Sequence, residues 1–253
     1  MKVQLVHTMI VTMMMCVVGV TASSSSSSSS STRPQWHVYQ NNPNGTRFCF
    51  DATWSVSGAF ETCVQMFVSP HGLYIDIEAK SDTIQENAYV KCNDDLYNQE
   101  VVEVFISNET MKASPEHYWE IEVSPRDFVW LGYDYNPDGD RHNLSHTYYP
   151  CDRVSTKVEN YEDSWKASLF VSMDMLGQGS ENCDDGHKCH HYRANFFRVQ
   201  MIPSIWKPYK GHVTRDQVCS PDNCTFSCAN RPDTPEPDFH QTKYFGDLYL
   251  HFE

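Results

Sequence analysis

Apolar and polar residues alternate with a period of two along several stretches of the chain. In a β-strand successive side chains point to opposite faces of the sheet, so this period predicts strands. The clearest case is the stretch Asp94 to Ser107, where one face carries Val102, Val104 and Ile106 and the other carries Val101, Glu103 and Phe105. We therefore expect Glu103 on the less apolar face of a strand, with Tyr97 on the loop leading into it.

The same alternation predicts six further strands. They span Arg47 to Trp54, Gly72 to Lys80, Tyr118 to Ser124, Trp165 to Leu176, Tyr192 to Met201 and Phe239 to Glu253. The stretch Val129 to His146 is typical of a long polar and aromatic loop or hairpin, and Lys207 to Pro237 of a long insertion tied by disulfides. Many short alternating strands, without helical periodicity, indicate an all-β fold, either an antiparallel sandwich or a barrel.

The apolar faces of these strands are expected to point into the core. Two faces are particularly clear, and they consist of Leu73, Ile75, Ile77 and Ala79 in one strand and of Leu248, Leu250 and Phe252 in the other. Three tryptophans in or beside alternating strands, Trp54, Trp119 and Trp165, are predicted to be core residues.

The N-terminal residues do not share this pattern. Residues 1–22 combine a cationic start at Lys2, an apolar run from Met9 to Val20 and a small-residue exit at Ala22, which together predict a secretory signal peptide. That apolar run is too short to span a bilayer. Residues 23–34 are rich in serine and predict a flexible spacer, so the folded domain is expected over residues 35–253.

The chain is acidic, and this limits its partners. Its formal net charge is −14, and loss of the single positive charge of Lys2 with the signal peptide would take it from −14 to −15. Nucleic acid is not expected as a partner, because phosphate contacts need lysine and arginine. A neutral partner such as a glycan is compatible with this charge, and so are cations.

Nine cysteines remain once Cys16 leaves with the signal peptide, namely Cys49, Cys63, Cys92, Cys151, Cys183, Cys189, Cys219, Cys224 and Cys228. A secreted chain with this many cysteines is expected to use most of them in disulfides. The odd count leaves at least one cysteine free or paired to another chain, which allows a disulfide-linked partner.

Four Asn-x-Ser/Thr sequons also fit a secreted, extracellular protein, because such sites are glycosylated in the secretory pathway. They begin at Asn44, Asn108, Asn143 and Asn223. The last of them has a cysteine in its middle position. A glycan at any of these sites would mark surface outside the core.

Tyr97 and Glu103 are chemically suited to bind a sugar. An aromatic ring covers the apolar C–H face of a sugar, and a carboxylate accepts hydrogen bonds from its hydroxyls. A glutamate that keeps an edge strand soluble would give the same local pattern. Trp206, flanked by prolines in PSIWKPY, is either a second aromatic contact or a buried core tryptophan.

The order of several sequence pieces extends this interpretation. These are DDLY-x3-VVEVFI, YWEIEVSP, WKASLFVSMDML, YRANFFRVQ, the tryptophan of SIW, and FHQTKYFGDLYL at the C-terminus. Together, from about Phe48 to Phe252, they resemble carbohydrate-binding module family 9, a module attached to xylanases, and the wider group of DOMON-like sandwiches. The resemblance implies an antiparallel β-sandwich of jelly-roll or DOMON-like type, with a Cys-rich insertion before the last strand.

The resemblance also implies a function. A sugar would be held between two aromatic side chains while polar residues bind its hydroxyls, in a non-catalytic module linked to the breakdown of xylan and cellulose. Tyr97 and Trp206 fall at the two stacking positions of the family, and Glu103 falls at its sugar-binding carboxylate. The first aromatic is often tryptophan in the family, so the ring of Tyr97 offers less stacking area.

Further polar contacts in the family come from the next strand, where this chain has Glu120 and Glu122. The basic and amide residues of the family are not matched there. Arg193 and Asn195 lie on a strand that could approach the same region. The insertion from Cys219 to Cys228 could cover or reshape the groove, so the ligand could differ from cellulose- and xylan-type sugars.

The stretch DYNPDGD matches the start of a calcium loop. Its oxygen ligands would come from Asp134, Asn136, Asp138 and Asp140, with Gly139 at the sharp turn. The loop lacks the glutamate that should close it, and Asn-Pro-Asp-Gly also forms turns without metal. Structural calcium is in addition implied by the family resemblance.

A second group of candidate metal ligands is the HKCHH stretch, with His187, Cys189, His190 and His191. Zinc uses such ligands, but the spacing matches no standard zinc pattern. In an oxidising compartment Cys189 is expected in a disulfide instead, for example with Cys183.

Two other functions stay open at this point. A glycosidase needs two carboxyl groups about 5–9.5 Å apart, and Glu103, Glu120 and Glu122 stand on neighbouring strands. The chain has no room for a separate catalytic domain, so we do not expect an enzyme. A DOMON-type haem domain needs axial ligands such as methionine or histidine; Met173 and Met175 are available, but a haem-attachment motif is missing from the sequence.

Overall fold

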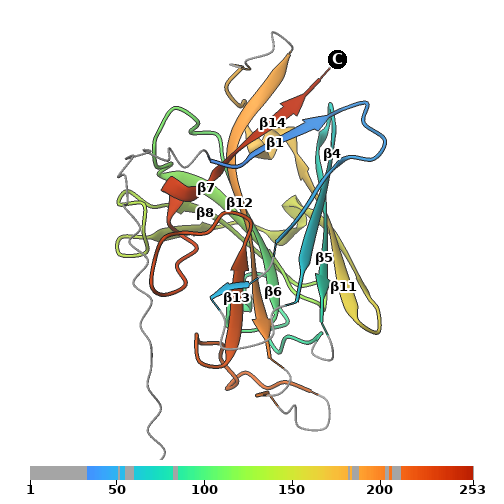
Figure 1. Cartoon of the computed structure of the whole chain (residues 1–253), viewed down its shortest axis with the longest axis vertical. Coiled ribbons are helices and arrows are strands. Elements are labelled where there is room, and N and C mark those ends of the chain that lie inside the picture. The colour runs from blue at the N-terminus through green and yellow to red at the C-terminus, as the bar shows by residue number, and fades with distance from the viewer. Residues whose placement is uncertain are drawn as a thin grey trace, which may run out of the picture. The chain divides into compact units, whose positions relative to one another are not determined.

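The computed structural model of the chain describes residues 33–50, 52–54, 60–81, 85–181, 183, 188–202, 205–206 and 212–252. The predicted signal peptide and residues 23–32 of the predicted spacer lie outside the described residues. All the described strands belong to two β-sheets that face each other (Figure 1). This arrangement confirms the prediction of a β-sandwich.

The larger sheet, which we call sheet A, has the spatial order β1-β14-β12-β6-β7-β8-β9, and β13 and β3 continue it beside the second half of β12. The bounds of these strands are Gln35–Tyr39 (β1), Ala52–Trp54 (β3), Val101–Ser107 (β6), His117–Val123 (β7), Val129–Tyr135 (β8), Ser145–Tyr148 (β9), Cys189–Met201 (β12), Cys224–Cys228 (β13) and Gly246–His251 (β14).

The smaller sheet, sheet B, has the order β10-β11-β5-β4-β2. Its strands are Thr46–Phe50 (β2), Thr62–Ser69 (β4), Gly72–Lys80 (β5), Ser155–Asn160 (β10) and Ser164–Ser172 (β11). Helical structure in the described residues consists of single turns, at Leu96–Asn98 (η1), Cys151–Arg153 (η2), Met173–Leu176 (α1) and Thr242–Tyr244 (η3).

The main core lies between the two sheets and is built from the inward faces predicted by the alternation. Val102, Val104 and Ile106 of β6 are about 1 % exposed and belong to it. The apolar face of β5, and Leu248 and Leu250 of β14, also belong to it, with Phe252 packed at its margin. Trp165 is fully buried and Trp119 is partly buried against this core, as predicted. The side chain of Trp54 lies outside the described residues.

The outer face of sheet A around β6 is also buried, beneath the insertion that was expected to be able to cover the groove. Residues 212–245, which we call the covering segment, pack Val213, Phe239 and Phe245 over that face, against Val101 and Phe105 of β6. The predicted disulfide-tied insertion is therefore a second layer of the structure, with a strand of its own, β13. It encloses the polar face of β6 that the alternation predicts to be partly exposed.

Several predicted boundaries are wrong for local reasons. The stretch Arg47 to Trp54 is two strands in different sheets, β2 in sheet B and β3 in sheet A. Of the two alternatives for Val129 to His146, the hairpin is correct, because β8 pairs with β9. The strand predicted up to Leu176 ends at Ser172, whose side chain accepts a hydrogen bond from Met175 N and caps α1. The strands β1, β4, β10 and β13 were not predicted.

One strand pair differs in direction from the antiparallel pattern of the sandwich. β1 pairs with β14 in parallel, in five positions from Gln35 opposite Asp247 to Tyr39 opposite His251. The first strand of the domain is thus attached to the last one, at one edge of sheet A (Figure 1).

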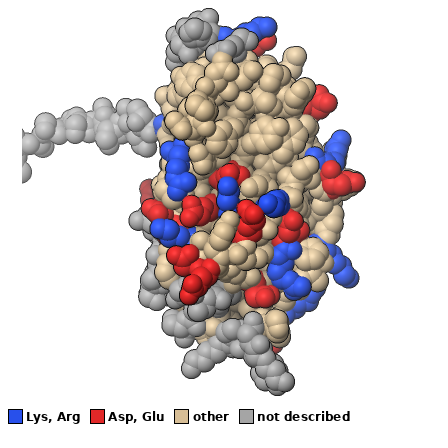
Figure 2. Space-filling view, turned by 90° about the vertical axis from the view of Figure 1, so that its right-hand side faces the viewer, with Lys and Arg blue, Asp and Glu red and all other residues tan. Residues whose placement is uncertain are grey.

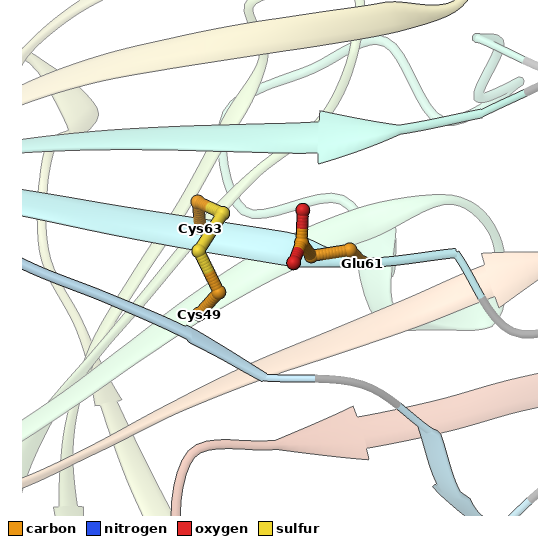
Figure 3. A group of neighbouring side chains, drawn as sticks. All are labelled: Cys49, Glu61 and Cys63. Atoms are coloured by element: carbon orange, nitrogen blue, oxygen red, sulfur yellow. A yellow bond between two sulfur atoms is a disulfide. The ribbon is translucent and has the colours of Figure 1, made fainter.

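Eight of the nine predicted cysteines form four disulfides, Cys49–Cys63, Cys92–Cys151, Cys183–Cys189 and Cys219–Cys224. The suggested pairing of Cys183 with Cys189 is confirmed. Cys228 is buried at the end of β13, and a disulfide-linked partner stays a prediction. In Figure 3 the carboxylate of Glu61 lies beside the Cys49–Cys63 bridge, but both sulfurs of this group are bonded to each other and are not metal ligands.

The outer face of sheet B is polar and solvated. Figure 2 looks onto this side of the molecule and shows acidic and basic side chains interspersed on it. Ion pairs link the strands there: Lys166 of β11 pairs with Asp76 of the neighbouring β5 at 2.6 Å, and Arg47 of β2 pairs with Glu78 of β5 across β4 at 3.4 Å. Mixed charges of this kind keep an exposed sheet face soluble.

Candidate functional site

A row of acidic residues lies on the covered face of sheet A. Glu103 of β6 stands directly opposite Glu122 of β7, and Glu120 stands opposite Phe105. All three glutamates are at most 4 % exposed. The period of two aligns them because residues 120 and 122 point to the same side of β7, and the pairing register places residue 103 beside them. The structure thus brings together three of the predicted site residues.

Burial changes the acidity of this row. Loss of water raises the pKa of Glu103 to about 8, an effect that the charge of Arg141 reduces. Burial, together with the neighbouring Asp134, holds the pKa of Glu120 well above its usual value. Burial, together with Glu103, does the same to the pKa of Glu122. A carboxyl group whose charge is disfavoured in this way carries a proton and both donates and accepts hydrogen bonds.

A cavity of about 560 Å³ opens onto this row. Glu103 and Glu120 form part of its wall, and Tyr97 and the adjacent Asn98 border it. Further wall residues come from the β8–β9 hairpin and from the covering segment, and they include Trp130, Arg141, His146, Tyr148, Phe226, Phe239 and His240. The cavity therefore combines buried polar groups with several aromatic side chains, as sites for small molecules do.

Tyr97 lies in the η1 turn with 46 % of its surface exposed. Its loop is held by the covering segment. Gln99 donates from its side chain to the carbonyls of Thr214 and Gln217, at 2.7 and 2.9 Å. The Asn98 carbonyl accepts a hydrogen bond from Cys219 N at 2.8 Å. The ring is therefore presented to solvent on a loop that is fixed to the covering segment.

Glu100, between this loop and β6, is the central acceptor of a buried network. One of its oxygens accepts from Arg198 and from the indole nitrogen of Trp165, at 3.2 Å for the latter, and the other accepts from Met201 N at 2.9 Å. Trp165 belongs to sheet B, while Arg198 and Met201 belong to β12 of sheet A. This network joins the two sheets beneath the Tyr97 loop.

Next to the acidic row, three elements meet at Glu120, Asp134 and His240. Potential ligand atoms of these side chains all lie within 4.8 Å of one another. Asp134 Oδ1 accepts a hydrogen bond from His146 Nδ1 at 2.8 Å, and the Tyr118 hydroxyl bonds His240 Nδ1 at 2.7 Å. Burial lowers the pKa of His240 to about 4, so its imidazole is neutral.

Trp206 lies outside the group of described residues that line the cavity. It is partly buried against the core under the covering segment, and its indole nitrogen donates to the carbonyl of Asn223 at 2.8 Å. A stacking role for Trp206 stays a prediction. Within the described wall of the cavity, Tyr148, which is 57 % exposed, is another ring on the side of the β8–β9 hairpin.

Arg193 and Asn195 are fully buried on β12, and their polar groups bind the polypeptide itself. Arg193 donates to the carbonyls of Phe245 and Lys112, and Asn195 exchanges two hydrogen bonds with the backbone of Asn230. They hold the covering segment on sheet A. The side-chain donors that a sugar would need are thus already engaged by the chain itself.

The four candidate calcium ligands point in different directions. Asp134 is buried beside Glu120, and Asn136 donates to the carbonyl of His240 at 2.8 Å. Asp138 accepts from Asn143, and Asp140 accepts from the backbone and ring of His142. In this fully described turn the carboxylates of Asp134, Asp138 and Asp140 do not form a common cluster. Calcium binding by the domain stays a prediction.

The remaining predicted sites are distributed elsewhere. Of the HKCHH group, His187 lies outside the described residues, and His191 bonds Asp247 at 2.9 Å. Met173 and Met175 are in or beside the α1 turn, partly buried against the main core. Three sequon asparagines, Asn44, Asn108 and Asn143, are exposed, whereas Asn223 is half-buried and donates to the Val218 carbonyl. Glycosylation stays a prediction.

Sequence reasoning missed His240, His146 and the aromatic wall of the cavity. Asp134 could have been placed on the acidic face, since residues 130, 132 and 134 alternate and Gly132 stands opposite Glu120. A side chain at Gly132 would meet the ring of Trp130, which occupies that space. His240 gives no such signal, because it reaches the site from a distant segment without regular structure.

Comparison of the sequence with known proteins gives a similar extracellular protein but no family. No protein-family model matches the chain. An extracellular protein of Arthroderma benhamiae is 26 % identical over 197 residues, which cover 74 % of this chain and 78 % of that protein. No helix in the described part of the chain is long and apolar enough to cross a membrane.

Solved structures resemble the chain in fold. A protein of Bacteroides uniformis described as carbohydrate-binding matches with a TM-score of 0.60 and 13 % identity, over 87 % of this chain and 99 % of its own. A family 9 carbohydrate-binding module of Caldicellulosiruptor kristjanssonii matches in complexes with cellotriose and with glucose. The TM-scores are 0.53 and 0.54 and the identities 10 % and 11 %, over 87 % of this chain and 95 % and 97 % of the module. The chain thus has the fold of a carbohydrate-binding module.

Proposed function

We propose that this domain is a secreted, non-catalytic carbohydrate-binding module and that its sugar site is the cavity beside Tyr97 and Glu103. The observation that carries this proposal is the combination, in one cavity, of an exposed aromatic ring on a fixed loop with a buried acidic row. The Caldicellulosiruptor module of similar fold is complexed with cellotriose and with glucose, which supports the choice of ligand class.

The chemistry of the cavity suits a neutral polyol. The ring of Tyr97 offers a flat apolar surface to the C–H face of a pyranose. Glu103, whose pKa is raised to about 8 by burial, is mostly protonated at neutral pH. It can therefore donate to one sugar hydroxyl and accept from another without the cost of burying a charge. A negatively charged ligand is disfavoured by the acidic wall and the net charge of −14.

The second ring of the proposed stacking pair has two candidates. Trp206 is the position that the family resemblance implies, and Tyr148 is a ring that lines the cavity. Both are compatible with weak binding, because each stacked aromatic contributes on the order of 0.5–1.5 kcal/mol beyond buried area, before ordering costs are subtracted. Their separate alanine variants decide which of them contacts the sugar.

Calorimetric titration of the purified domain with glucose, cellotriose and xylotriose tests the proposal. Tyr97→Ala and Glu103→Gln should each weaken binding, the former by roughly 2- to 12-fold for the loss of one stacked ring. Tyr161→Ala is a matched control, because Tyr161 is 52 % exposed and lies outside the described cavity wall. If none of these sugars binds, or if Tyr97→Ala and Glu103→Gln bind as well as the wild type, the assignment fails.

The same samples separate binding from hydrolysis. Glu103 and Glu122 face each other across β6 and β7, and a glycosidase uses two such carboxyl groups in different protonation states. If the domain only binds sugars, cellotriose and xylotriose should remain intact after prolonged incubation. Release of glucose or xylose that disappears in Glu103→Gln would make the protein an enzyme.

Secretion is part of the proposal. Four disulfides fit an oxidising compartment, and an extracellular protein is among the similar sequences. Expression of the full chain in a eukaryotic secreting host should deliver the domain to the medium, without residues 1–22 and with glycans at one or more of the exposed sequons. Retention of the full chain inside the cells would contradict this part.

A further inference from the structure

We propose that Glu120, Asp134 and His240 bind a divalent first-row transition-metal ion, with Zn²⁺ as the expected occupant. The three side chains come from β7, from β8 and from the covering segment. Their potential ligand atoms lie within 4.8 Å of one another, close enough for one ion to contact all three after small side-chain rotations. This inference goes beyond the proposed sugar binding and does not depend on it.

Two oxygens of this cluster have no hydrogen-bond partner among the described residues. Glu120 Oε2 and Asp134 Oδ2 are both buried, on residues that are 4 % and 0 % exposed. Buried polar atoms are normally satisfied, and those that are not call for an explanation such as an ion. Both atoms belong to the same three-residue group, so one ion would satisfy them together.

The acidic residues around the cluster favour a cation as well, because a metal ion displaces the protons that buried carboxyl groups carry in its absence. Glu103, Glu120, Glu122 and Asp134 are buried near one another on neighbouring strands. Buried carboxylates are generally paired with a cation or coordinate a metal.

The buried arginines of sheet A are engaged elsewhere. Arg198 binds Glu100, and Arg193 binds backbone carbonyls. Arg141, at the cavity wall, has a largely exposed side chain that is paired with Asp238 at 3.3 Å. A bound divalent ion would supply positive charge inside the acidic group itself.

The donor set selects the class of metal. Two carboxylates and one imidazole are typical of Zn²⁺ and its neighbours in the first transition row, whereas Ca²⁺ takes six to eight oxygens. Surrounding groups orient the ligands, as in many metal sites. His146 bonds the other oxygen of Asp134, and Asn136 donates to the backbone carbonyl of His240.

The site faces the cavity on one side. Glu120 and His240 are both part of the cavity wall, so a fourth coordination position is open to water or to an oxygen of a bound molecule. Three protein ligands with an open position is the arrangement of an accessible zinc site, in contrast to closed structural sites with four. It shares only Asp134 with the calcium loop considered from the sequence.

Zinc binding to the tag-free domain, stripped with a chelator and dialysed, tests this proposal. Calorimetry should show one Zn²⁺ per chain, with Ca²⁺ and Mg²⁺ much weaker. Glu120→Gln, Asp134→Asn and His240→Ala should each weaken Zn²⁺ binding at least about 10-fold, by comparison with the effect of lost metal contacts elsewhere. Glu236→Gln, at an exposed acid of the same cavity wall, should bind Zn²⁺ as the wild type does.

A second measurement needs no variant and therefore does not depend on how the variants fold. Crystals of the wild-type domain soaked in Zn²⁺ should give an anomalous peak between Glu120, Asp134 and His240. The proposal is overturned if the wild type binds no Zn²⁺, or if the peak lies elsewhere. It is also overturned if only a change at His191, in the separate histidine group, removes binding.

Discussion

The Arg198→Met substitution would leave Glu100 buried without its cation, inside the network that joins the two sheets. Both side chains of this ion pair are fully buried. The Nε and Nη2 atoms of Arg198 donate to one oxygen of Glu100 at 3.1 and 2.7 Å, and Nη1 donates to the Thr62 hydroxyl on sheet B at 3.3 Å. Methionine can fill much of the volume but replaces none of these donors.

The expected cost follows from this geometry. Removing one partner of a buried, hydrogen-bonded ion pair destabilises a protein by about 3–5 kcal/mol, because the remaining charge is left without compensation. Small domains are stable by about 5–15 kcal/mol in total. Arg198→Met should therefore remove a large share of the free energy of unfolding, although the residue touches neither the cavity nor the solvent.

Urea unfolding with the disulfides intact measures this cost. Arg47→Met is the control, since its ion pair with Glu78 has side chains 49 % and 41 % exposed and should contribute at most about 1 kcal/mol. The double variant Arg198→Met/Glu100→Met should be more stable than Arg198→Met alone, because no charge is left buried. An Arg198→Met variant as stable as Arg47→Met would refute the reasoning.

Three other outcomes are expected. Glu109→Gln should lower stability by about 1–2 kcal/mol at pH 7. Although burial alone would raise the pKa of Glu109, hydrogen bonds from the backbone of Glu116, from Lys112 and from His117 lower it. Its stabilisation is thus present above the unfolded-state pKa and lost as pH falls through the lower folded-state value. The gap to wild type in thermal melts should therefore shrink below about pH 4, and a constant gap would contradict this. Cys49→Ser/Cys63→Ser opens a bridge with a sequence separation of 14 and should cost about 3 kcal/mol in denaturant unfolding. Gly132→Ala would bring a methyl group within 2.4 Å of the Trp130 ring; it should change tryptophan fluorescence and lower stability by about 1–3 kcal/mol, and an unchanged melt and spectrum would argue against this packing.

The strands with strict alternation could be predicted because each has one face in the main core. β5 and β6 show this best, with Ile75 and Val104 both buried between the sheets. β8 was not predicted as a strand of its own, because Gly132 and Asp134 interrupt the apolar pattern on its covered face. Arg47 to Trp54 was predicted as one strand because the change of sheet between β2 and β3 leaves the local alternation intact.

The candidate site was predictable only in part. Glu103, Glu120 and Glu122 could be placed together because their positions follow from two adjacent alternating strands. Their near-complete burial depends on the covering segment, whose packing against Val101 and Phe105 is set by tertiary contacts with no local pattern. His240 was missed for the same reason. Arg193 and Asn195 were expected to bind sugar, but their side chains instead hold the covering segment on sheet A.

The parallel pairing of β1 with β14 determines how the domain responds to mechanical load. Because the two strands run in the same direction, a pull between residue 35 and residue 251 slides one strand along the other. All five rungs of the ladder then resist together, whereas an antiparallel pair pulled from one end would open rung by rung. Tension applied between the two ends of the domain is therefore borne by the whole β1–β14 ladder.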